Sequence, residues 1–159
     1  MVRTGDQAPD FTAPLATGDV ESITFSEELE RNAPIVLAFF PGAFTGGCTR
    51  EMCTFQDRLG AFDDLEATVY GVSVDSPFAL NAFREENALS FSLVSDFDKE
   101  LIDDYDVRTD FEDLGVYGLA KRSVFVVDET GEIAYDWVSD DAGVEPDYDA
   151  VERAVADLS

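Results

Sequence analysis

Two kinds of hydrophobic pattern alternate along the chain. One is a short run in which every position is apolar, clearest at residues 35–40, and such runs are typical of strands buried on both faces of a sheet. The other is an apolar residue at every third or fourth position, which is typical of a helix with one buried face. The expected strands span residues 21–25, 35–40, 67–74, 91–94, 123–127 and 132–137. The expected helices span residues 48–62, 76–88, 99–105 and 147–158, with one further helical turn at 27–30 that Ser26 would cap.

Strands that alternate with helices predict an α/β fold in which a central β-sheet carries helices on both faces. Residues 123–127 and 132–137 flank a turn that contains Gly131, so they are expected to form a hairpin that makes the sheet mixed. The first twenty residues contain Pro9, Pro14 and Gly18 and are expected to be an irregular lead-in. No repeat or linker is visible, so we expect residues 1–159 to form a single domain.

Charge and composition narrow the possible functions. The chain has 35 acidic and 10 basic side chains, a net charge of −25, no histidine and two cysteines. A surface this negative repels phosphates and anionic headgroups, so we expect neither nucleic-acid nor membrane binding. Without histidine, Ser-His-Asp and Cys-His catalysis and histidine metal ligands are excluded, and two cysteines cannot form a four-cysteine zinc site.

The acidic residues are scattered over the chain and do not form a tail. This pattern indicates a folded protein that works in high salt, where screening relieves self-repulsion. The composition resembles that of haloarchaeal cytosolic proteins, and the alternative is an ordinary acidic protein. No apolar leader is visible and the longest apolar run has six residues, which predicts a cytoplasmic protein.

Cys48 begins a predicted helix just after the buried run 35–40, at the sheet edge where α/β proteins gather ligands. The unpaired N–H groups of a first helical turn favour a thiolate there, and Gly46 and Gly47 leave room for a small ligand. The alternative is that Cys48 is a small core residue. It begins the apolar stripe formed by residues 48, 52, 55, 59 and 62.

Cys53 lies five residues further along the same predicted helix, about 140° around its axis, and its neighbours one turn away are polar. Helix geometry separates the two cysteine Cα atoms by roughly 8–9 Å. A disulfide needs these atoms within about 7 Å, so the two thiols could join only if the helix start unwinds. A Cys-x-x-Cys pair is absent, which argues against a thioredoxin-type exchanger itself.

The spacing Pro41-x-x-x-Thr45-x-x-Cys48 matches the active-site signature of the peroxiredoxins, and the chain resembles that family over nearly its whole length. The resemblance includes residues 5–11 (Gly-Asp-Gln-Ala-Pro-Asp-Phe) and 122–128 (Arg-Ser-Val-Phe-Val-Val-Asp). The motif Phe-Thr-Gly-x-Cys-x-x-Glu is similar to that of the alkyl hydroperoxide reductase E branch. The extra cysteine is similar to that of the peroxiredoxin Q (bacterioferritin comigratory protein) branch. The resemblance implies a thioredoxin-like fold.

The resemblance also implies a role for each motif residue. Cys48 would be the peroxidatic thiolate, and the Thr45 hydroxyl would bind the peroxide. Arg122 would keep the thiolate charged and stabilise charge on the breaking O–O bond. Pro41 would shield the thiolate from water, and Glu51 would orient Arg122. Taken singly, each of four residues has an ordinary interpretation. Pro41 would be a strand end, and Thr45 would be a helix cap. Arg122 would form a surface ion pair, and Glu51 would be a first-turn carboxylate favoured by the helix dipole.

The implied function is a thiol-dependent peroxidase that reduces hydrogen peroxide and organic hydroperoxides through a sulfenic acid at Cys48. Cys53 would resolve that acid as an intramolecular disulfide, and a thioredoxin-like or other dithiol would reduce the disulfide. No metal, flavin or haem is implied. The alternatives are a redox sensor or holdase that uses the same cysteine without turnover, and a structural domain with a core Cys48. A monomer and a homodimer are both compatible with the sequence.

Overall fold

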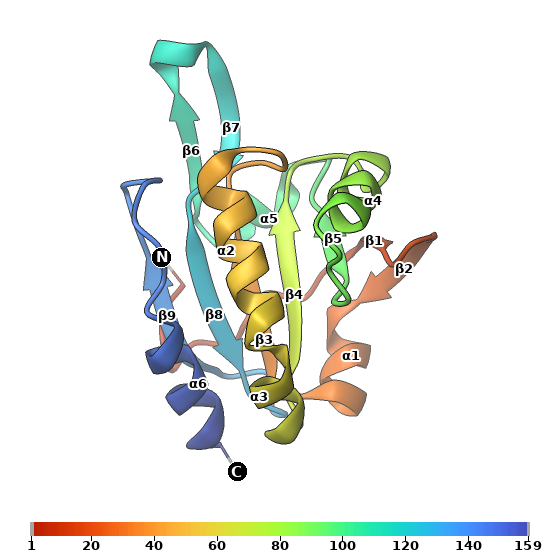
Figure 1. Cartoon of the computed structure of the whole chain (residues 1–159). Helices are drawn as coiled ribbons and strands as arrows, with labels where there is room; N and C mark the ends of the chain where they lie inside the picture. The colour runs from red at the N-terminus through yellow and green to blue at the C-terminus, as the bar shows by residue number, and fades with distance from the viewer. Residues whose placement is uncertain (1, 159) are drawn as a thin grey trace.

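A mixed seven-stranded sheet forms the centre of the structure, a computed structural model that describes residues 2–158 (Figure 1). The strands lie in the order β2-β1-β5-β4-β3-β8-β9. Their bounds are Thr12–Ala16 (β1), Val20–Thr24 (β2), Ile35–Phe39 (β3), Thr68–Ser73 (β4), Leu93–Ser95 (β5), Ser123–Val127 (β8) and Ile133–Val138 (β9). Strands β3, β4 and β5 are parallel, whereas β8 pairs with β3 in the antiparallel sense and makes the sheet mixed.

Helices cover both faces of this sheet, which confirms the predicted α/β fold (Figure 1). The helices are α1 (Phe25–Asn32), α2 (Gly46–Asp57), α3 (Leu59–Asp64), α4 (Pro77–Glu86), α5 (Glu100–Asp104) and α6 (Tyr148–Ala156). Side chains of α2, α3, α4 and α6 fill the core on one face, and side chains of α1 and α5 fill the core on the other.

Strand β3 shows why an unbroken apolar run occupies the centre of a sheet. All five of its residues are fully buried. Because successive strand side chains point to opposite faces, Val36 and Ala38 join one core cluster while Ile35, Leu37 and Phe39 join the other. A polar residue at any of these positions would lie in a core, which explains why the pattern does not alternate.

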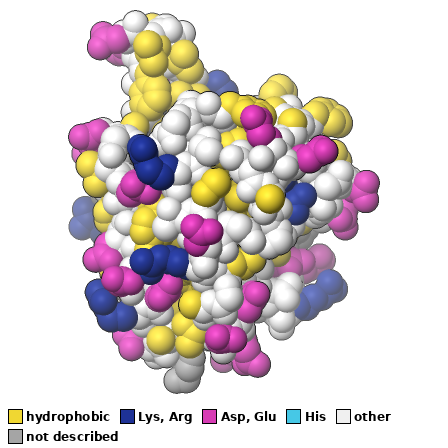
Figure 2. Space-filling view, viewed as in Figure 1, with side chains coloured by type: hydrophobic (Ala, Val, Ile, Leu, Met, Phe, Trp, Pro, Cys, Tyr) yellow, Lys and Arg dark blue, Asp and Glu magenta, His cyan; other side chains and the backbone are white. Residues whose placement is uncertain are grey.

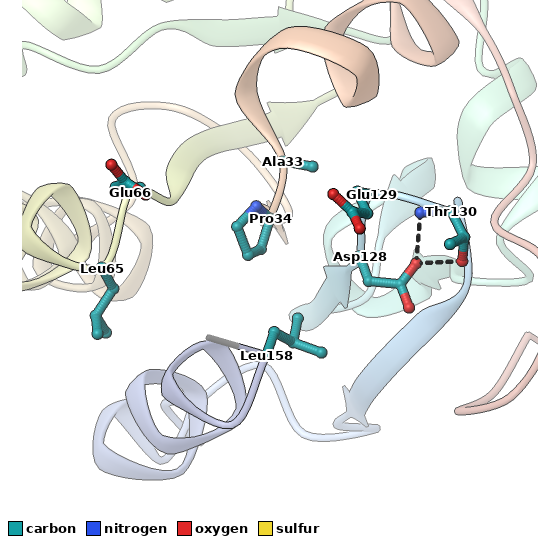
Figure 3. Close-up of a pocket in the computed structure, with 8 residues that line it drawn as sticks. All are labelled: Ala33, Pro34, Leu65, Glu66, Asp128, Glu129, Thr130 and Leu158. Carbon is teal, nitrogen blue, oxygen red and sulfur yellow. Dashed lines mark hydrogen bonds between the residues drawn. The ribbon is translucent and has the colours of Figure 1, made fainter.

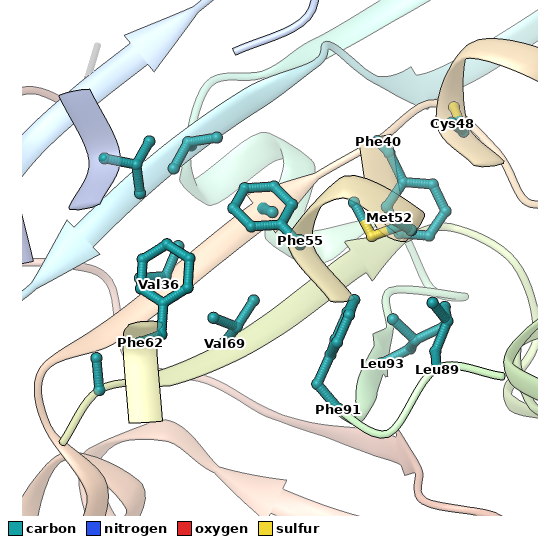
Figure 4. Packing of buried hydrophobic residues seen from close by; sticks show 14 of the residues in the cluster. Val36, Phe40, Cys48, Met52, Phe55, Phe62, Val69, Leu89, Phe91 and Leu93 are labelled. Carbon is teal, nitrogen blue, oxygen red and sulfur yellow. The ribbon is translucent and has the colours of Figure 1, made fainter. Parts of the chain in front are cut away.

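The core beneath α2 carries the apolar stripe that the sequence shows (Figure 4). Met52, Phe55 and Phe62 are fully buried, and Cys48 lies at the end of the same cluster, near Phe40. Burying an apolar side chain of this size contributes about 1.5–3 kcal/mol to stability. The stripe therefore fixes the face that α2 presents to the sheet, and with it the position of Cys48.

Three sequence expectations about the elements were wrong. Residues 12–16 of the expected irregular lead-in form β1, where Pro14 is tolerated because it pairs with Ser22 at a position that has no partner in β5. Helix 48–62 is two helices that break at Arg58, two residues before Gly60, a poor helix former. Helix α1 begins one residue before Ser26, so Thr24 takes the N-cap position.

A hairpin that the sequence analysis missed projects from the body of the molecule. It consists of β6 (Arg108–Phe111), a short 3-10 helix η1 (Glu112–Leu114) and β7 (Val116–Ala120). Its tip shows apolar side chains above a surface on which acidic groups are dispersed (Figure 2). Gly115 and Gly118 both have positive φ angles, a backbone conformation in which glycine is the least strained residue.

Candidate active site

Cys48 occupies the third helical position of α2, just beyond the carboxyl end of β3. Phe40 extends the β3 ladder by donating its N–H to the Val72 carbonyl at 2.9 Å, and the buried Pro41 follows the end of that ladder. Thr45 then takes the N-cap position of α2 with extended backbone angles. Cys48 is only 1% exposed, so its sulfur is almost completely shielded from solvent.

Arg122 is held by two side chains of α2 and by a backbone carbonyl from a distant part of the chain. Its Nη2 donates to Cys48 Sγ at 3.4 Å, its Nη1 to Glu51 Oε1 at 3.0 Å, and its Nε to the Ala142 carbonyl at 3.1 Å. The sheet register explains the placement, because Ser123 pairs with Phe39 and Arg122 therefore precedes β8 at the edge where β3 ends. The alternative interpretation, in which Arg122 forms an ion pair on the surface, is wrong because Arg122 is only 3% exposed.

The charge on Arg122 depends on its buried partners. Burial works to lower the pKa of the guanidinium, but the attraction of Glu51 and Cys48 outweighs burial and raises that pKa above its ordinary value. The guanidinium is therefore a fixed positive charge beside the cysteine sulfur.

Glu51 lies three residues after Cys48 on the same side of α2 and is fully buried. Burial raises the pKa of its carboxyl group to about 8, against the opposing pull of Arg122. Its Oε2 atom has no hydrogen-bond partner among the residues that the structure describes. The buried guanidinium of Arg122 thus faces two acidic groups, the Glu51 carboxyl and the Cys48 thiol. When Glu51 carries a proton, the positive charge of Arg122 is left available to Cys48.

The loop between β3 and α2 has a specific shape. The Thr45 hydroxyl does not cap α2 and instead donates to the Gly42 carbonyl at 3.0 Å. Phe44 adopts a positive φ of 67°, and its ring packs edge-on against Phe83 with the ring centroids 5.4 Å apart. The Ala43 N–H donates to Asp75 Oδ2 at 2.8 Å.

Gly47 has a steric role at the first turn of α2. A Cβ atom at this position would come within 3.1 Å of Arg122 Nη2 and 3.8 Å of the Ala142 carbonyl. The glycine therefore allows the guanidinium and residue 142 to approach the helix start.

Cys53 also lies within α2, on a side of the helix that faces residue 87. Its thiol is partly buried and makes a long contact of 3.9 Å to Asn87 Oδ1. Burial, followed by the charge of Asp57, raises the pKa of the Cys53 thiol. Both cysteines are free thiols in one continuous helix, so the helix must open before they can join.

Two groups at this site escaped the sequence analysis. Ala142 contributes only its backbone carbonyl, for which the sequence holds no signal. Asp75 follows the buried run 67–74, and a polar residue at the carboxyl end of a neighbouring strand is a signal that could have been used.

A separate hollow of about 510 Å³ lies away from this site, beside the start of β3 and the β8–β9 turn (Figure 3). Its lining combines a few apolar side chains with acidic ones: Ala33, Pro34, Leu65, Glu66, Asp128, Glu129, Thr130 and Leu158. Within residues 2–158, no cluster of three or more Cys, Asp or Glu side chains is arranged to hold a metal ion. In the same part of the chain, every helix is too short or too polar to span a bilayer.

A thioredoxin-like α/β sheet that buries a cysteine at the start of a helix, in contact with a guanidinium, defines a class of thiol-dependent oxidoreductases. Within that class, the chain belongs to the AhpC/TSA family, whose family model matches residues 4–136. The resemblance to peroxiredoxins is thereby confirmed, and the protein is a peroxidase, an oxidoreductase that acts on peroxide.

Individual relatives agree with this assignment. The chloroplastic 2-cysteine peroxiredoxin of Chattonella marina is 38% identical over 147 residues, which cover 87% of this chain and 71% of that protein. Peroxiredoxin Bcp of Bacillus subtilis is 33% identical over 137 residues, covering 86% of this chain and 85% of that protein. The crystal structure of peroxidoxin BcpB from Mycobacterium tuberculosis superposes with a TM-score of 0.85 and 28% identity, covering 100% of this chain and 99% of that one.

Proposed function

We propose that Cys48 is the peroxidatic residue and that it reduces hydrogen peroxide and organic hydroperoxides. Its thiolate attacks the terminal oxygen of ROOH, the O–O bond breaks, and the released alkoxide takes up a proton and leaves as ROH. The sulfur is oxidised to a sulfenic acid, Cys–SOH. The observation that carries this proposal is the 3.4 Å contact between Cys48 Sγ and Arg122 Nη2, made by a cysteine that is almost completely buried.

Arg122 and Glu51 have separate tasks in this proposal. Arg122 holds the thiolate in its charged form and stabilises the negative charge that develops on the breaking O–O bond. Glu51 is a positioning residue, because its Oε1 fixes one arm of the guanidinium while the other arm faces the sulfur.

Thr45 and Pro41 complete the peroxide site. The Thr45 hydroxyl uses its one O–H to donate a hydrogen bond to the Gly42 carbonyl. Its lone pairs can therefore accept a hydrogen bond from the O–H of a hydroperoxide. The unpaired N–H groups at the start of α2 donate to the peroxide oxygens. Pro41 is buried behind the loop and excludes water from the thiolate.

Cys53 resolves the sulfenic acid in this cycle. Its thiol condenses with Cys–SOH to form the Cys48–Cys53 disulfide and one molecule of water, after the first turn of α2 opens. Two features of that turn favour opening: its first two residues, Gly46 and Gly47, are weak helix formers, and the Thr45 side chain does not cap it. An external dithiol of the thioredoxin type then reduces the disulfide and is itself oxidised. We place this cycle in the cytoplasm.

The proposal is tested by measuring hydrogen peroxide consumption in molar salt with dithiothreitol or a thioredoxin as reductant. Wild-type protein is expected to turn over many times, and Cys48→Ser is expected to lose turnover completely. Oxidation of Cys48 by one equivalent of peroxide, without turnover, would instead support the redox sensor or holdase. A Cys48 that peroxide does not oxidise would support a structural cysteine and refute the proposal.

Cys53→Ser is the matched control for the resolving step, because it keeps Cys48 and the peroxide site. The mass of peroxide-treated wild type is expected to fall by two hydrogens, whereas the mass of Cys53→Ser is expected to rise by one or more oxygens. If wild type also gains oxygen and forms no disulfide, an outside thiol resolves Cys48 and the role of Cys53 is refuted.

A further inference from the structure

A single peptide group connects Asp75 to Thr45. The Gly42–Ala43 amide donates its N–H to Asp75 Oδ2 at 2.8 Å, and the C=O of the same amide accepts the Thr45 hydroxyl proton at 3.0 Å. The two hydrogen bonds therefore lie at opposite ends of one rigid planar unit. Moving either end of this unit moves the other.

The carboxylate of Asp75 is itself fixed to the sheet. Ser73 Oγ donates to Asp75 Oδ2 at 2.7 Å, and Ser95 Oγ donates to the Asp75 carbonyl at 2.7 Å. Ser73 and Ser95 are both buried and pair with each other across β4 and β5. Asp75 thus transmits the position of the central strands to the loop that carries Thr45.

The direction of these bonds has a chemical consequence. A carboxylate that accepts from the amide N–H polarises the amide and makes its carbonyl oxygen a better acceptor. That carbonyl then holds the single Thr45 hydroxyl proton more firmly. Because a hydroxyl has one donor and two acceptor sites, a fixed proton fixes the direction of the lone pairs.

We propose that Asp75 is a positioning residue for peroxide reduction, which orients the Thr45 hydroxyl through the Gly42–Ala43 peptide group so that its lone pairs face the O–H of a bound hydroperoxide. This inference rests on the proposed function of Cys48 and deepens it. Asp75 does not touch the sulfur, so it acts on the peroxide and not on the thiolate.

The test is a double-mutant cycle between Asp75→Ala and Thr45→Val, with the second-order rate constant of Cys48 oxidation by hydrogen peroxide as the readout. Each single variant is expected to lower this rate constant about tenfold, the effect of losing one hydrogen bond of ordinary strength at the transition state. The double variant is expected to react about as slowly as Thr45→Val alone, because Asp75 acts only through Thr45. Thr45→Ser keeps the hydroxyl, so Asp75→Ala should still slow the reaction in that background.

Alkylation of Cys48 by iodoacetamide separates positioning from general damage, because this reaction needs the thiolate but no peroxide site. The alkylation rate of Asp75→Ala is expected to stay within about twofold of wild type. Asp98→Ala, which removes a charge from an exposed position at the same sheet edge, controls for long-range charge and is expected to change neither rate.

Additive losses in the cycle, or equal losses of peroxide and alkylation rates, would overturn the proposal. Should Asp75→Ala fail to fold, Asp75→Asn can be used, because the asparagine keeps an acceptor. With Thr45 present, Asp75→Asn is expected to lower the rate constant of Cys48 oxidation about threefold. With Val at position 45 it is expected to leave that rate constant unchanged. A wild type that does not react with peroxide overturns this proposal and the proposed function together. A reactive wild type with an equally reactive Asp75→Ala overturns this proposal alone.

Discussion

Glu51→Gln is expected to change how the stability of the protein depends on pH. The Glu51 carboxyl is fully buried, and burial raises its pKa from an ordinary value of 4.5 to about 8. Between these two values the folded state holds a proton that the unfolded state has released. The contribution of this group to stability is therefore complete below pH 4.5 and is lost as the pH rises through 8.

The magnitude follows from linkage. One proton held by the folded state and absent from the unfolded state costs about 1.4 kcal/mol of unfolding free energy for each unit of rising pH. From about pH 5.5 to about pH 7.5, wild type should therefore lose roughly 2–3 kcal/mol that Glu51→Gln does not lose. All other titrating groups are shared by the two proteins and cancel in the difference.

Urea unfolding at the two pH values, followed by the fluorescence of Trp137 in constant high salt, measures this difference. The glutamine keeps an oxygen that can accept from Arg122, so both proteins should fold. A difference between wild type and Glu51→Gln that stays constant within about 0.5 kcal/mol would show that Glu51 is ionised throughout. It would refute the inference that a proton on Glu51 leaves Arg122 free for Cys48.

Three other perturbations have expected outcomes. The methyl group added in Gly46→Ala would meet open space, so the substitution should strengthen the start of α2 by up to about 1 kcal/mol. In quenched-flow mass spectrometry, disulfide formation should then slow up to about fivefold while Cys48 oxidation does not slow. An unchanged rate of disulfide formation would contradict opening at this turn. Phe83→Ala removes the ring beneath Phe44 and Phe40 and should cost about 3–5 kcal/mol in urea unfolding. Raising the salt concentration from about 0.1 M to about 1 M shortens the screening length from about 10 Å to about 3 Å. Because this weakens the repulsion between the acidic side chains, the melting temperature should rise. A lower or unchanged melting temperature would contradict the self-repulsion argument.

The sequence predicted the parts of the fold that depend on burial. The run 35–40, in which every position is apolar, and the mainly apolar run 67–74 are typical of central strands, and both lie in a sheet whose two faces are covered. Strand β1 and the β6–β7 hairpin were missed because their exposed positions weaken the apolar pattern. Pairing partners, and not local composition, make those segments strands.

The site divides in a similar way. The motif from Pro41 to Cys48 is contiguous and could be found by spacing alone, whereas Arg122 lies 74 residues beyond Cys48 and only the resemblance indicated it. The physical reason for their contact is the antiparallel register of β3 and β8, which composition does not encode. The Ala142 carbonyl could not be predicted, because a backbone acceptor has the same chemistry at every residue.

The placement of Arg122 also bears on the proposed role of Cys48 in so acidic a protein. A net charge of −25 opposes any additional negative charge, and the effect of distant carboxylates is screened by salt beyond about 10 Å or less. The guanidinium contact at 3.4 Å is far shorter than that length and buried, so salt weakens it little. Added salt therefore removes the unfavourable long-range field and leaves the favourable contact in place. One of only ten basic side chains is thus buried beside Cys48, and its contact supports the proposed peroxidatic role at the high salt that the composition predicts.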